Sequence, residues 1–580
     1  KKRNSANLFV ECLENEGVQY IFGVPGEENL DFLEALRTSS INLIVTRGEQ
    51  SAVFMAATVG RLTGRVGVAL STLGPGATNL VTGVAYADLG GMPLLVITGQ
   101  KPIRKSKQGQ FQVINAVRMM EPLTKYSRTI ESVDRIPSMV RQAVKLAESE
   151  RPGAVHLELP EDIAGESAPP DLKPIPSKKV RRPAPDPEDI TNAIKMIEEA
   201  KRPLVVVASG ANRKLIRKQL LNFLDKTGIP FVTTQMGKGV ENENSKLYVG
   251  TTALSGGDYV HKALEYADTI IMLGHDISEK PPTILTPEKH KVIHINFTPA
   301  DIDDVYVPTY EIVGDVSHTL WAIAENIKVQ STWDFEYFFK IKEKLNNAIL
   351  EHSNTNTFPM LPSRLVKDVE EVVAEDGILA LDNGMYKIWF ARNYKAQDQN
   401  SILLDNALAT MGAGLPSGIA SKMIFPDKKV LVVAGDGGIM MNIAELETAC
   451  RLGLDLVVLI LNDGGYGMIS WKQKAMKMEE FGLKFGNPDF VALAESFGAK
   501  GHRVEKVEDL KNILTTAFTE KGVHVIDCPV DYSQNLEDLG SRRRIKKYII
   551  WQSYPKTQQR WKSTESTKKS LMMFWNQKYL

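Results

Sequence analysis

Short apolar segments alternate with amphipathic helical stretches in three successive parts of the chain. Strands that alternate with helices are typical of parallel sheets covered by helices on both faces. We therefore predict an α/β protein with three tandem doubly wound domains, each built on a parallel sheet. The predicted strands are 43–45, 66–70, 93–98 and 154–159 in the first part, 203–210, 229–234, 269–274 and 291–296 in the second, and 378–382, 428–435, 454–462 and 524–530 in the third.

The distribution of proline sets the first domain boundary. Residues 166–187 contain seven prolines, which indicates a semi-rigid linker. A second break combines a predicted helix with the polar segment HSNTNTFP. The predicted organisation is therefore an N-terminal domain at 1–165, a linker at 166–187, a central domain at 188–330, a linker at 331–360, a third domain at 361–540 and a tail at 541–580.

The tail differs from the rest of the chain in charge. Residues 541–580 carry eleven Lys or Arg residues against the single acidic residue Glu565, although the whole chain has a net charge of zero. One interpretation is a basic arm that binds nucleic acid or another acidic surface. The other, which we favour, is an extension without regular structure. Nucleic acid is therefore not an expected partner.

Composition narrows the class of protein. The 580 residues are 43% hydrophobic and 24% charged, close to the averages of globular proteins. No apolar run approaches the roughly 18 residues that cross a bilayer, and the N-terminus lacks the apolar core of a secretory peptide. The three cysteines have no metal-ligand spacing and suit a reducing compartment. We expect a cytoplasmic protein without membrane association.

Glycine-rich turns with polar side chains follow two predicted strands of the third domain. The segment GDGG at 435–438 follows one strand, and Asn462 and Asp463 follow the next, with Asp463 27 residues after Asp436. A strand, helix and strand form a right-handed crossover, so both turns lie at the carboxyl edge of one sheet. Oxygen ligands beside backbone N–H groups suit Mg²⁺ and a diphosphate. The sequence therefore predicts a metal and diphosphate site at this edge.

These two motifs resemble the cofactor motif of thiamine-diphosphate-dependent enzymes such as acetolactate synthase. The resemblance covers about residues 5–535. It implies that Asp436, Asp463 and the backbone carbonyl of Gly465 are Mg²⁺ ligands. Many relatives have Asn where Asp463 stands, whereas the catabolic acetolactate synthases have Asp, so Asp463 is the preferred ligand and Asn462 is the alternative.

A second match is Glu49 in the segment VTRGEQSAVFMA, just after the strand 43–45. In the family, a carboxyl group on the aminopyrimidine ring nitrogen promotes the tautomer that deprotonates the thiazolium carbon. The resemblance implies that Glu49 is this activating acid. Relatives often have His immediately before the Glu, whereas this chain has Gly48, so no such His can act here.

Other positions match segments that contact the cofactor or substrate in relatives. Met411 resembles the bulky residue that bends the cofactor, and Gln112 resembles a glutamine on the substrate side. The remaining cofactor-binding residues implied by the resemblance are Pro25, Gly26, Thr72, Gly76, Asn79, Asn383, Gly384, Met385, Tyr386, Gly435, Gly437, Gly438, Gly465 and Tyr466.

The resemblance also implies an assembly, because Glu49 and Asp436 lie in different domains. In the family, the N-terminal domain binds the pyrimidine and the third domain binds the diphosphate and Mg²⁺, and the two come from different subunits. We therefore expect a homodimer or a homotetramer with its sites at the subunit interface. The sequence does not determine which of the two forms, or whether a regulatory subunit exists.

The sequence also favours one reaction within the family. Pyruvate-type decarboxylases commonly use a pair of adjacent histidines, whereas the nine histidines here are isolated from one another along the chain. The segments LATMGAGLPSG, GGMPLLVITGQ and GYGMISWKQ look most like acetolactate synthase, which joins two pyruvates with loss of CO₂. We expect this carboligase activity. The alternatives are a 2-oxo acid decarboxylase, a pyruvate oxidase, an aldehyde ligase or an inactive cofactor-binding relative.

The biosynthetic acetolactate synthases also bind FAD in the central domain. Residues 275–280 follow a strand there but lack the arginine pattern of that branch, and Glu161 stands where FAD-dependent members often have Lys. The chain therefore resembles the catabolic, FAD-free branch. Its expected cofactors are thiamine diphosphate and Mg²⁺; FAD is not expected, although the sequence does not determine whether it is bound.

Overall fold

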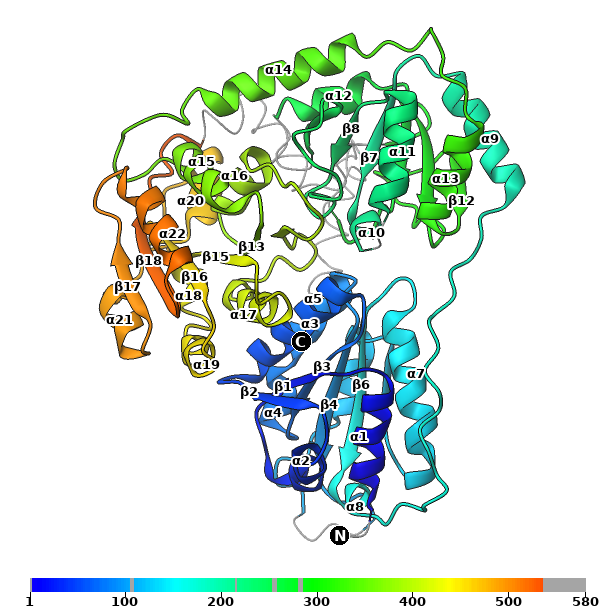
Figure 1. Cartoon of the computed structure of the whole chain (residues 1–580), viewed down its shortest axis with the longest axis vertical. Coiled ribbons are helices and arrows are strands. Elements are labelled where there is room, and N and C mark those ends of the chain that lie inside the picture. Colours follow the sequence, from blue (N-terminus) through cyan, green and yellow to red (C-terminus); the bar gives the residue numbers. More distant parts are fainter. Residues whose placement is uncertain (1–2, 105–108, 214–215, 253–257, 280–284, 536–580) are drawn as a thin grey trace, which may run out of the picture.

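The chain folds into three six-stranded sheets, and every strand pair is parallel (Figure 1). The structure is a computed structural model that describes residues 3–104, 109–213, 216–252, 258–279 and 285–535. The three sheets confirm the predicted α/β class with three doubly wound domains. The tail at 541–580 lies outside the described residues.

The N-terminal sheet has the strand order β2-β1-β3-β4-β6-β5. Its strands are β1 (Tyr20–Gly23), β2 (Asn42–Val45), β3 (Gly67–Ser71), β4 (Leu94–Gln100), β5 (Tyr126–Thr129) and β6 (Ala154–Pro160). The helices of this part are α1 (Ser5–Asn15), η1 (Glu27–Asn29), α2 (Leu30–Arg37), α3 (Glu49–Thr63), α4 (Pro75–Asn79), α5 (Val81–Leu89), α6 (Ala116–Met120), η2 (Glu121–Leu123), η3 (Val133–Arg135), α7 (Ile136–Glu148) and α8 (Glu161–Ala164).

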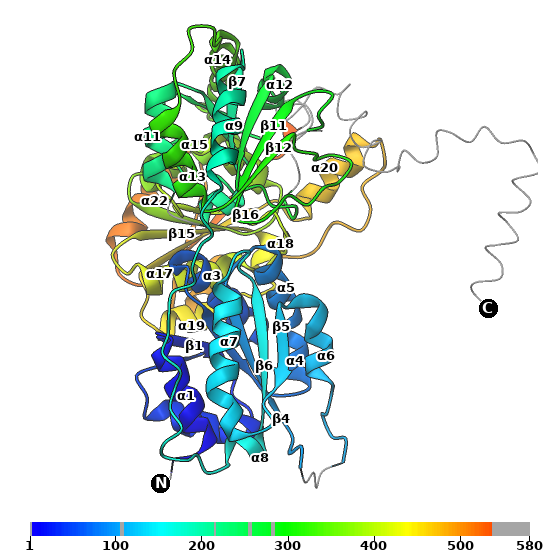
Figure 2. The same ribbon diagram turned by 90° about the vertical axis from the view of Figure 1, so that its right-hand side faces the viewer.

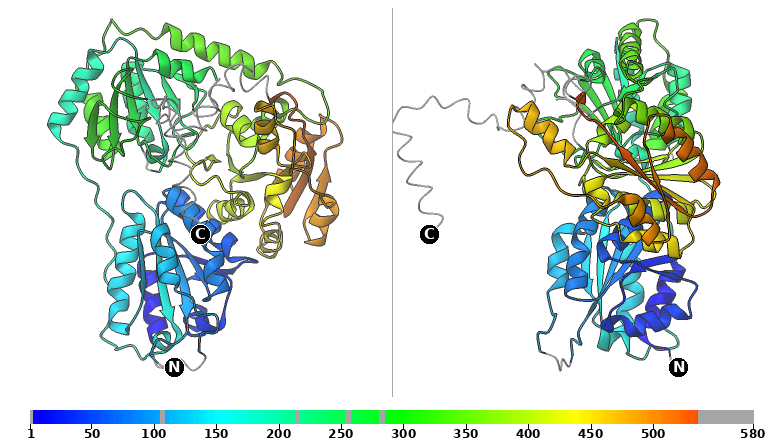
Figure 3. Two further views of the ribbon diagram at one scale, coloured as in Figure 1. Left: turned by 180° about the vertical axis from the view of Figure 1, so that it is seen from behind. Right: turned by 90° about the vertical axis from the view of Figure 1, so that its left-hand side faces the viewer.

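The central sheet has the order β12-β11-β10-β7-β8-β9. Its strands are β7 (Pro203–Val207), β8 (Phe231–Thr233), β9 (Tyr248–Thr251), β10 (Thr269–Leu273), β11 (Lys291–Asn296) and β12 (Tyr310–Val313). The helices are α9 (Pro187–Glu198), α10 (Ser209–Asn212), α11 (Arg217–Thr227), α12 (Val260–Tyr266) and α13 (Val316–Asn326), followed by α14 (Glu336–Leu350). Helix α14 runs from the central towards the third domain (Figures 1 and 3).

The third sheet has the order β14-β13-β15-β16-β18-β17. Its strands are β13 (Gly377–Leu381), β14 (Ile402–Leu403), β15 (Lys429–Gly435), β16 (Leu456–Asn462), β17 (Lys500–Arg503) and β18 (Val523–Pro529). The helices are α15 (Pro362–Val373), α16 (Tyr386–Asn393), α17 (Gly414–Ile424), α18 (Asp436–Ile439), α19 (Glu445–Arg451), α20 (Gly467–Ala475), α21 (Phe490–Ser496) and α22 (Asp509–Thr519). Helix α20 stands out from this domain and has no fully buried residue (Figure 2).

The sequence pattern did not predict six of these strands. Five of them, β5, β9, β12, β14 and β17, are edge strands of two to four residues. A short edge strand needs few apolar side chains, because one side of its backbone is unpaired and its faces are often exposed. Strand β17, for example, reads KGHR and has no fully buried residue. The twelve predicted segments are therefore mostly the central strands.

A shared core joins the N-terminal and third domains at helices α3 and α17, which lie side by side (Figures 1 and 2). Phe54 of α3 is fully buried, and its ring meets that of Tyr86 edge to face at a centroid distance of 5.1 Å. The hydroxyl of Thr58 donates to Ser417 Oγ of α17 at 3.0 Å. The buried residues form one cluster that includes both sheets, so the two domains cannot separate without exposing it.

We predict that Phe54→Ala destabilises the protein by about 3–5 kcal/mol, because it removes a buried aromatic ring from this shared core. Denaturant unfolding followed by circular dichroism measures the loss. Phe481 is 87% exposed, so Phe481→Ala is a matched control that should change stability by less than about 0.5 kcal/mol. Equal effects of the two substitutions would show that the cluster does not hold the domains together.

Candidate active site

The carboxyl edge of the third sheet brings Asp436 and Asp463 together. Asp436 follows β15, and Asp463 follows β16. The two strands are neighbours, with Gly435 opposite Leu461. The predicted crossover therefore places both acidic residues at one edge of the sheet, as the motif spacing indicated.

Asp436 is 1% exposed, and its carboxylate ties the two turns together. Oδ1 accepts a hydrogen bond from Gly437 N at 2.8 Å, and Oδ2 accepts one from Gly464 N at 2.8 Å. Gly464 has a φ of +67°, a conformation that favours glycine. The side chain of Asn487 donates to the same Oδ2 at 2.8 Å. Three donors thus fix the orientation of one buried carboxylate.

Asp463 lies close enough to Asp436 for the two charges to repel. Burial and the Asp436 carboxylate raise the pKa of Asp463 to about 7. Within the described part of the chain, no group of three or more His, Cys, Asp or Glu residues could hold a metal ion. A divalent cation here would therefore need backbone oxygens and ligand oxygens as well, which suits Mg²⁺ with a diphosphate.

Asn462 makes different contacts from Asp463. Its Nδ2 donates to Asp527 Oδ1 at 3.0 Å, and its Oδ1 accepts from Asn487 at 3.1 Å. Both polar atoms of the Asn462 amide thus have partners in the protein. Asn487 itself keeps a buried Oδ1 without a hydrogen bond among the described residues. This orphaned oxygen beside Asp436 fits a site that is completed by a bound group.

A pocket of about 560 Å³ opens beside Asp463. Its described lining residues all lie between 463 and 535, and they include Gly465 and Tyr466. The ring of Tyr466 lies 5.0 Å from that of Phe485. The pocket volume is within the range of small-molecule and cofactor sites.

The loop after β13 lies beside the same edge. Asn383 is its second residue, and the ring of Tyr386 is so close to Gly435 that a side-chain carbon at that glycine would lie 3.1 Å from it. Gly384 and Met385 connect the two, and Met385 is buried. Met411 follows Thr410, whose carbonyl accepts from Asn383 Nδ2 at 2.8 Å. The predicted residues of the third domain are therefore neighbours in the fold.

The predicted residues of the N-terminal domain gather at the carboxyl edge of its own sheet. Glu49 begins α3, and its Oε2 accepts from Asn79 Nδ2 at 3.0 Å. Its Oε1 faces Gly76. Thr72 donates to Glu28 at 2.5 Å. A side-chain carbon on Gly26, which follows Pro25, would lie only 2.3 Å from Thr72, so this close approach requires glycine.

Gln112 lies at the rim of this group in a strained conformation. It is exposed and has a φ of +59°. Its backbone oxygen packs against Gly74, where an added side-chain carbon would be 2.8 Å away. The structure therefore places Gln112 beside the turn at 72–79, while its side chain remains open to solvent.

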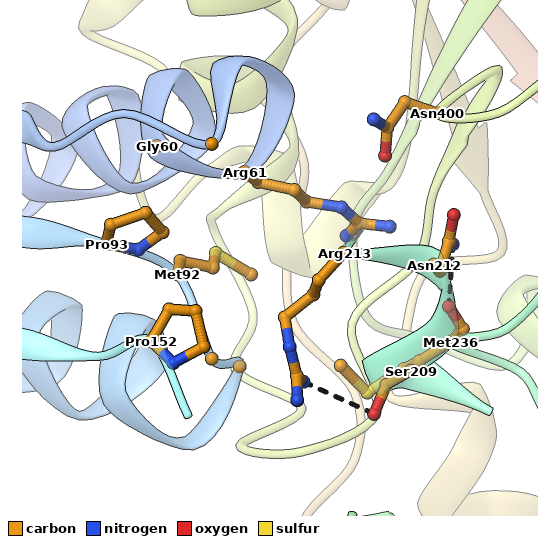
Figure 4. Close-up of a pocket in the computed structure, with 13 residues that line it drawn as sticks. Gly60, Arg61, Met92, Pro93, Pro152, Ser209, Asn212, Arg213, Met236 and Asn400 are labelled. Carbon is orange, nitrogen blue, oxygen red and sulfur yellow. Dashed lines mark hydrogen bonds between the residues drawn. The ribbon is translucent and has the colours of Figure 1, made fainter. Parts of the chain in front are cut away.

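A second, smaller pocket lies where the three domains meet (Figure 4). Arg61 and Met92 line it from the N-terminal domain, and Asn400 lines it from the third. From the central domain, Arg213 donates to Ser209 Oγ at 3.4 Å and to Asp276 Oδ2 at 3.0 Å. The free volume is about 30 Å³, which holds about one water molecule. This junction therefore leaves room for water rather than for a cofactor.

The structure also pairs two histidines that are separated in sequence. His502 of β17 and His524 of β18 stack with their ring centroids 5.2 Å apart, and Nε2 of the first lies 3.0 Å from Nδ1 of the second. Their spatial pairing corrects the view of nine isolated histidines. His524 is near the start of β18, however, so the pair lies away from the carboxyl edge that carries Asp436.

Comparison with known proteins gives the class of enzyme. Residues 3–119 match the N-terminal, residues 190–323 the central and residues 382–528 the C-terminal domain of thiamine pyrophosphate enzymes. The N-terminal and C-terminal matches are both thiamine pyrophosphate binding domains. The chain therefore belongs to the thiamine pyrophosphate enzymes, in the family of the acetolactate synthases. Membership implies thiamine diphosphate as cofactor, with Mg²⁺ as its usual partner ion.

Particular relatives support this family over nearly the full length of both chains. The chain is 32% identical to an acetolactate synthase of Bacillus subtilis over 552 residues, 94% of this chain and 96% of the relative. It is 33% identical to a probable acetolactate synthase large subunit of Methanococcus aeolicus, covering 92% and 93%. It is 32% identical to a catabolic acetolactate synthase of Raoultella terrigena, covering 92% and 96%.

Sequence reasoning missed two polar residues beside the site. Asn487 lies in a loop 51 residues after Asp436, and Lys387 is the second residue of α16. Neither belongs to a motif with a chemical signature. Only the burial of polar partners in the folded chain identifies them.

No helix among the described residues is long and apolar enough to cross a membrane.

We predict that Asn487→Ala weakens Mg²⁺ binding in the presence of thiamine diphosphate by about tenfold, because Asp436 loses a donor that orients it. Calorimetric titration with Mg²⁺ measures the affinity. Asn347 is exposed on α14, so Asn347→Ala is a control with no expected effect. An unchanged affinity in Asn487→Ala would show that Asn487 does not support the metal site.

Proposed function

We propose that this protein is a thiamine-diphosphate-dependent carboligase of the acetolactate synthase type, which decarboxylates pyruvate and joins the product to a second pyruvate. The observation that carries the proposal is the Asp436 and Asp463 pair at the carboxyl edge of a sheet, in a chain that matches acetolactate synthases over nearly its full length. When bound, thiamine diphosphate supplies the electron sink for the decarboxylation of a 2-oxo acid.

We assign the metal and diphosphate to the third domain. Asp436, Asp463 and the carbonyl of Gly465 would hold Mg²⁺, and Asn462 remains the weaker alternative because both of its amide atoms already bond to Asp527 and Asn487. Gly435, Gly437, Gly438 and Tyr466 would surround the diphosphate. Asn383, Gly384, Met385 and Tyr386 would border it on the side of β13, and Met411 would pack against the cofactor.

We assign proton handling to Glu49. Asn79 donates to Oε2 and so leaves Oε1 free to hold a proton that it shares with the pyrimidine ring. Pro25, Gly26, Thr72 and Gly76 provide the surface around this carboxyl group, and Gln112 lies on the substrate side. Glu49 is only half-buried in the single chain, although a group that moves a proton at a cofactor needs a closed site.

A second copy of the chain accounts for this open arrangement. The described residues that line the pocket beside Asp463 include none from the N-terminal domain. Glu49 and its neighbours are therefore free to close the pocket of another subunit. We propose a homodimer or a homotetramer in which each site combines the pyrimidine side of one subunit with the diphosphate side of its partner.

The central domain supports a branch of the family without FAD. At the carboxyl edge of its sheet, Asp276 pairs with Arg151 at 2.7 Å and with Arg213 at 3.0 Å. The ring of His275 lies 4.0 Å from that of Tyr306. The remaining pocket is about 140 Å³, smaller than the roughly 300 Å³ or more of typical ligand sites. The small pocket that the described residues leave at this edge favours a branch of the family without FAD.

The reaction is tested by incubation of the purified protein with pyruvate, Mg²⁺ and thiamine diphosphate, without FAD. We expect acetoin to appear only after acidification, since acid decarboxylates acetolactate. Acetaldehyde without acetoin would instead identify a decarboxylase. Acetyl phosphate formed in a parallel incubation with phosphate, FAD and O₂ as the electron acceptor would identify an oxidase. A lack of turnover with bound cofactor would point to another substrate or to an inactive relative.

We predict that Glu49→Gln lowers turnover by about two orders of magnitude or more while the affinity for thiamine diphosphate stays nearly unchanged, because the amide cannot share the proton. Steady-state kinetics and calorimetric titration separate the two effects. Glu121 is exposed in the same domain, so Glu121→Gln should retain full turnover. Full activity in Glu49→Gln would remove the assignment.

A further inference from the structure

Lys387 is a buried cation next to the proposed cofactor site. It is 7% exposed and lies in the first turn of α16. Its ammonium donates to Asn383 Oδ1 at 2.6 Å, to the carbonyl of Asp405 at 3.1 Å and to Asn406 Oδ1 at 3.3 Å. An ammonium has three N–H donors, so all three have an acceptor. Packing alone does not require a lysine at such a position.

Two buried carboxylates accompany this cation, and both bond to backbone N–H groups of the segment 405–412. Asp382 accepts from Gly412 N at 2.9 Å, and Asp405 accepts from Ala409 N at 2.8 Å. Asp382 and Asp405 are both almost fully buried. Lys387 therefore supplies positive charge beside two negative groups that shape the segment.

The segment 405–412 needs this support because its backbone is strained. Ala409 has a φ of +55°, in the left-handed region that costs about 1–2 kcal/mol for a residue with a side chain. Thr410 and Met411 follow directly. The Asn383 side chain bridges Lys387 to the segment, since Nδ2 donates to the carbonyl of Thr410 at 2.8 Å.

We propose that Lys387 is a positioning residue for the cofactor: its three hydrogen bonds hold Asn383 and the segment 405–412 so that Asn383 and Met411 are preorganised to receive thiamine diphosphate. This inference rests on the proposed cofactor contacts of those two residues. It adds a residue whose charge, rather than its shape, is needed for binding.

The ammonium form is required because a neutral amine has only two N–H donors, and its lone pair would face the third oxygen. Burial lowers the pKa of Lys387 to about 8, against the opposing effect of Asp405 and Asp382. Arg61 of α3 is the other charged group near Asp405. Since the bonds need the proton, the affinity for the cofactor is high below about pH 8 and falls as the pH rises through this value.

The test compares Lys387→Met and Lys387→Arg with the wild-type protein. The measurement is the Kd of thiamine diphosphate by calorimetry at saturating Mg²⁺, at about pH 6.5 and about pH 9. We expect Lys387→Met to raise the Kd about tenfold at the lower pH and to remove the alkaline loss. Lys387→Arg keeps a charge that does not titrate in this range, so it should also remove the alkaline loss while binding better than Lys387→Met.

Lys422 provides a matched control, since it is a buried lysine of the same domain whose Nζ donates to the carbonyl of Lys428 at 2.8 Å. Lys422→Met should lower thermal stability without a change in Kd. If Lys387→Met does not fold, Asn406→Ala removes one acceptor and should raise the Kd by a smaller factor. A Kd in the Lys387 variants equal to that of Lys422→Met, or an alkaline loss that persists in them, would overturn the inference.

The same titration separates this inference from the proposed function. If the wild-type protein binds thiamine diphosphate and the Lys387 variants bind it equally well, only the role of Lys387 fails. If the wild-type protein binds the cofactor but forms no acetolactate, the reaction assignment fails while the role of Lys387 stands on the Kd values alone.

Discussion

The proposed site depends on the burial of acidic groups at the carboxyl edge of the third sheet. Asp436 is held by Gly437 N, Gly464 N and Asn487 and faces Asp463, and among the described residues its hydrogen-bond donors are all uncharged. Burying two like charges is unfavourable, and either a proton on Asp463, whose pKa is raised to about 7, or a bound cation relieves the repulsion. The fold therefore favours binding of a divalent cation at this edge, and the bound cation would in turn coordinate a diphosphate.

The same domain balances a second set of buried charges internally. Asp382 and Asp405 fix the segment that carries Met411, and Lys387 supplies the opposite charge. The metal edge is thus left open for ligands, whereas the neighbouring loop is completed by protein groups. The metal edge is therefore the proposed binding part of the site, whereas the buried charges around Lys387 hold the segment 405–412 in position.

The shared core of α3 and α17 links the site to the N-terminal domain. Glu49 begins α3, so the helix that anchors the domains to each other also presents the proposed activating acid. Ser51 Oγ of this helix donates to Asn442 Oδ1 of the third domain at 3.0 Å. Packing at one face of α3 and chemistry at its N-terminus are therefore set by the same fifteen residues.

The sequence by itself determined the α/β class, most central strands, and the motifs that carry Glu49, Asp436 and Asp463, because hydrophobic period and motif spacing are local properties of the chain. It did not reveal the edge strand β17, which reads KGHR, or Asn487 and Lys387. Their roles depend on partners such as Asp436, distant in sequence, and on burial, which adjacent residues do not encode. Only the tertiary structure decided which polar groups are buried side by side, and therefore which of them must pair through hydrogen bonds or opposite charges.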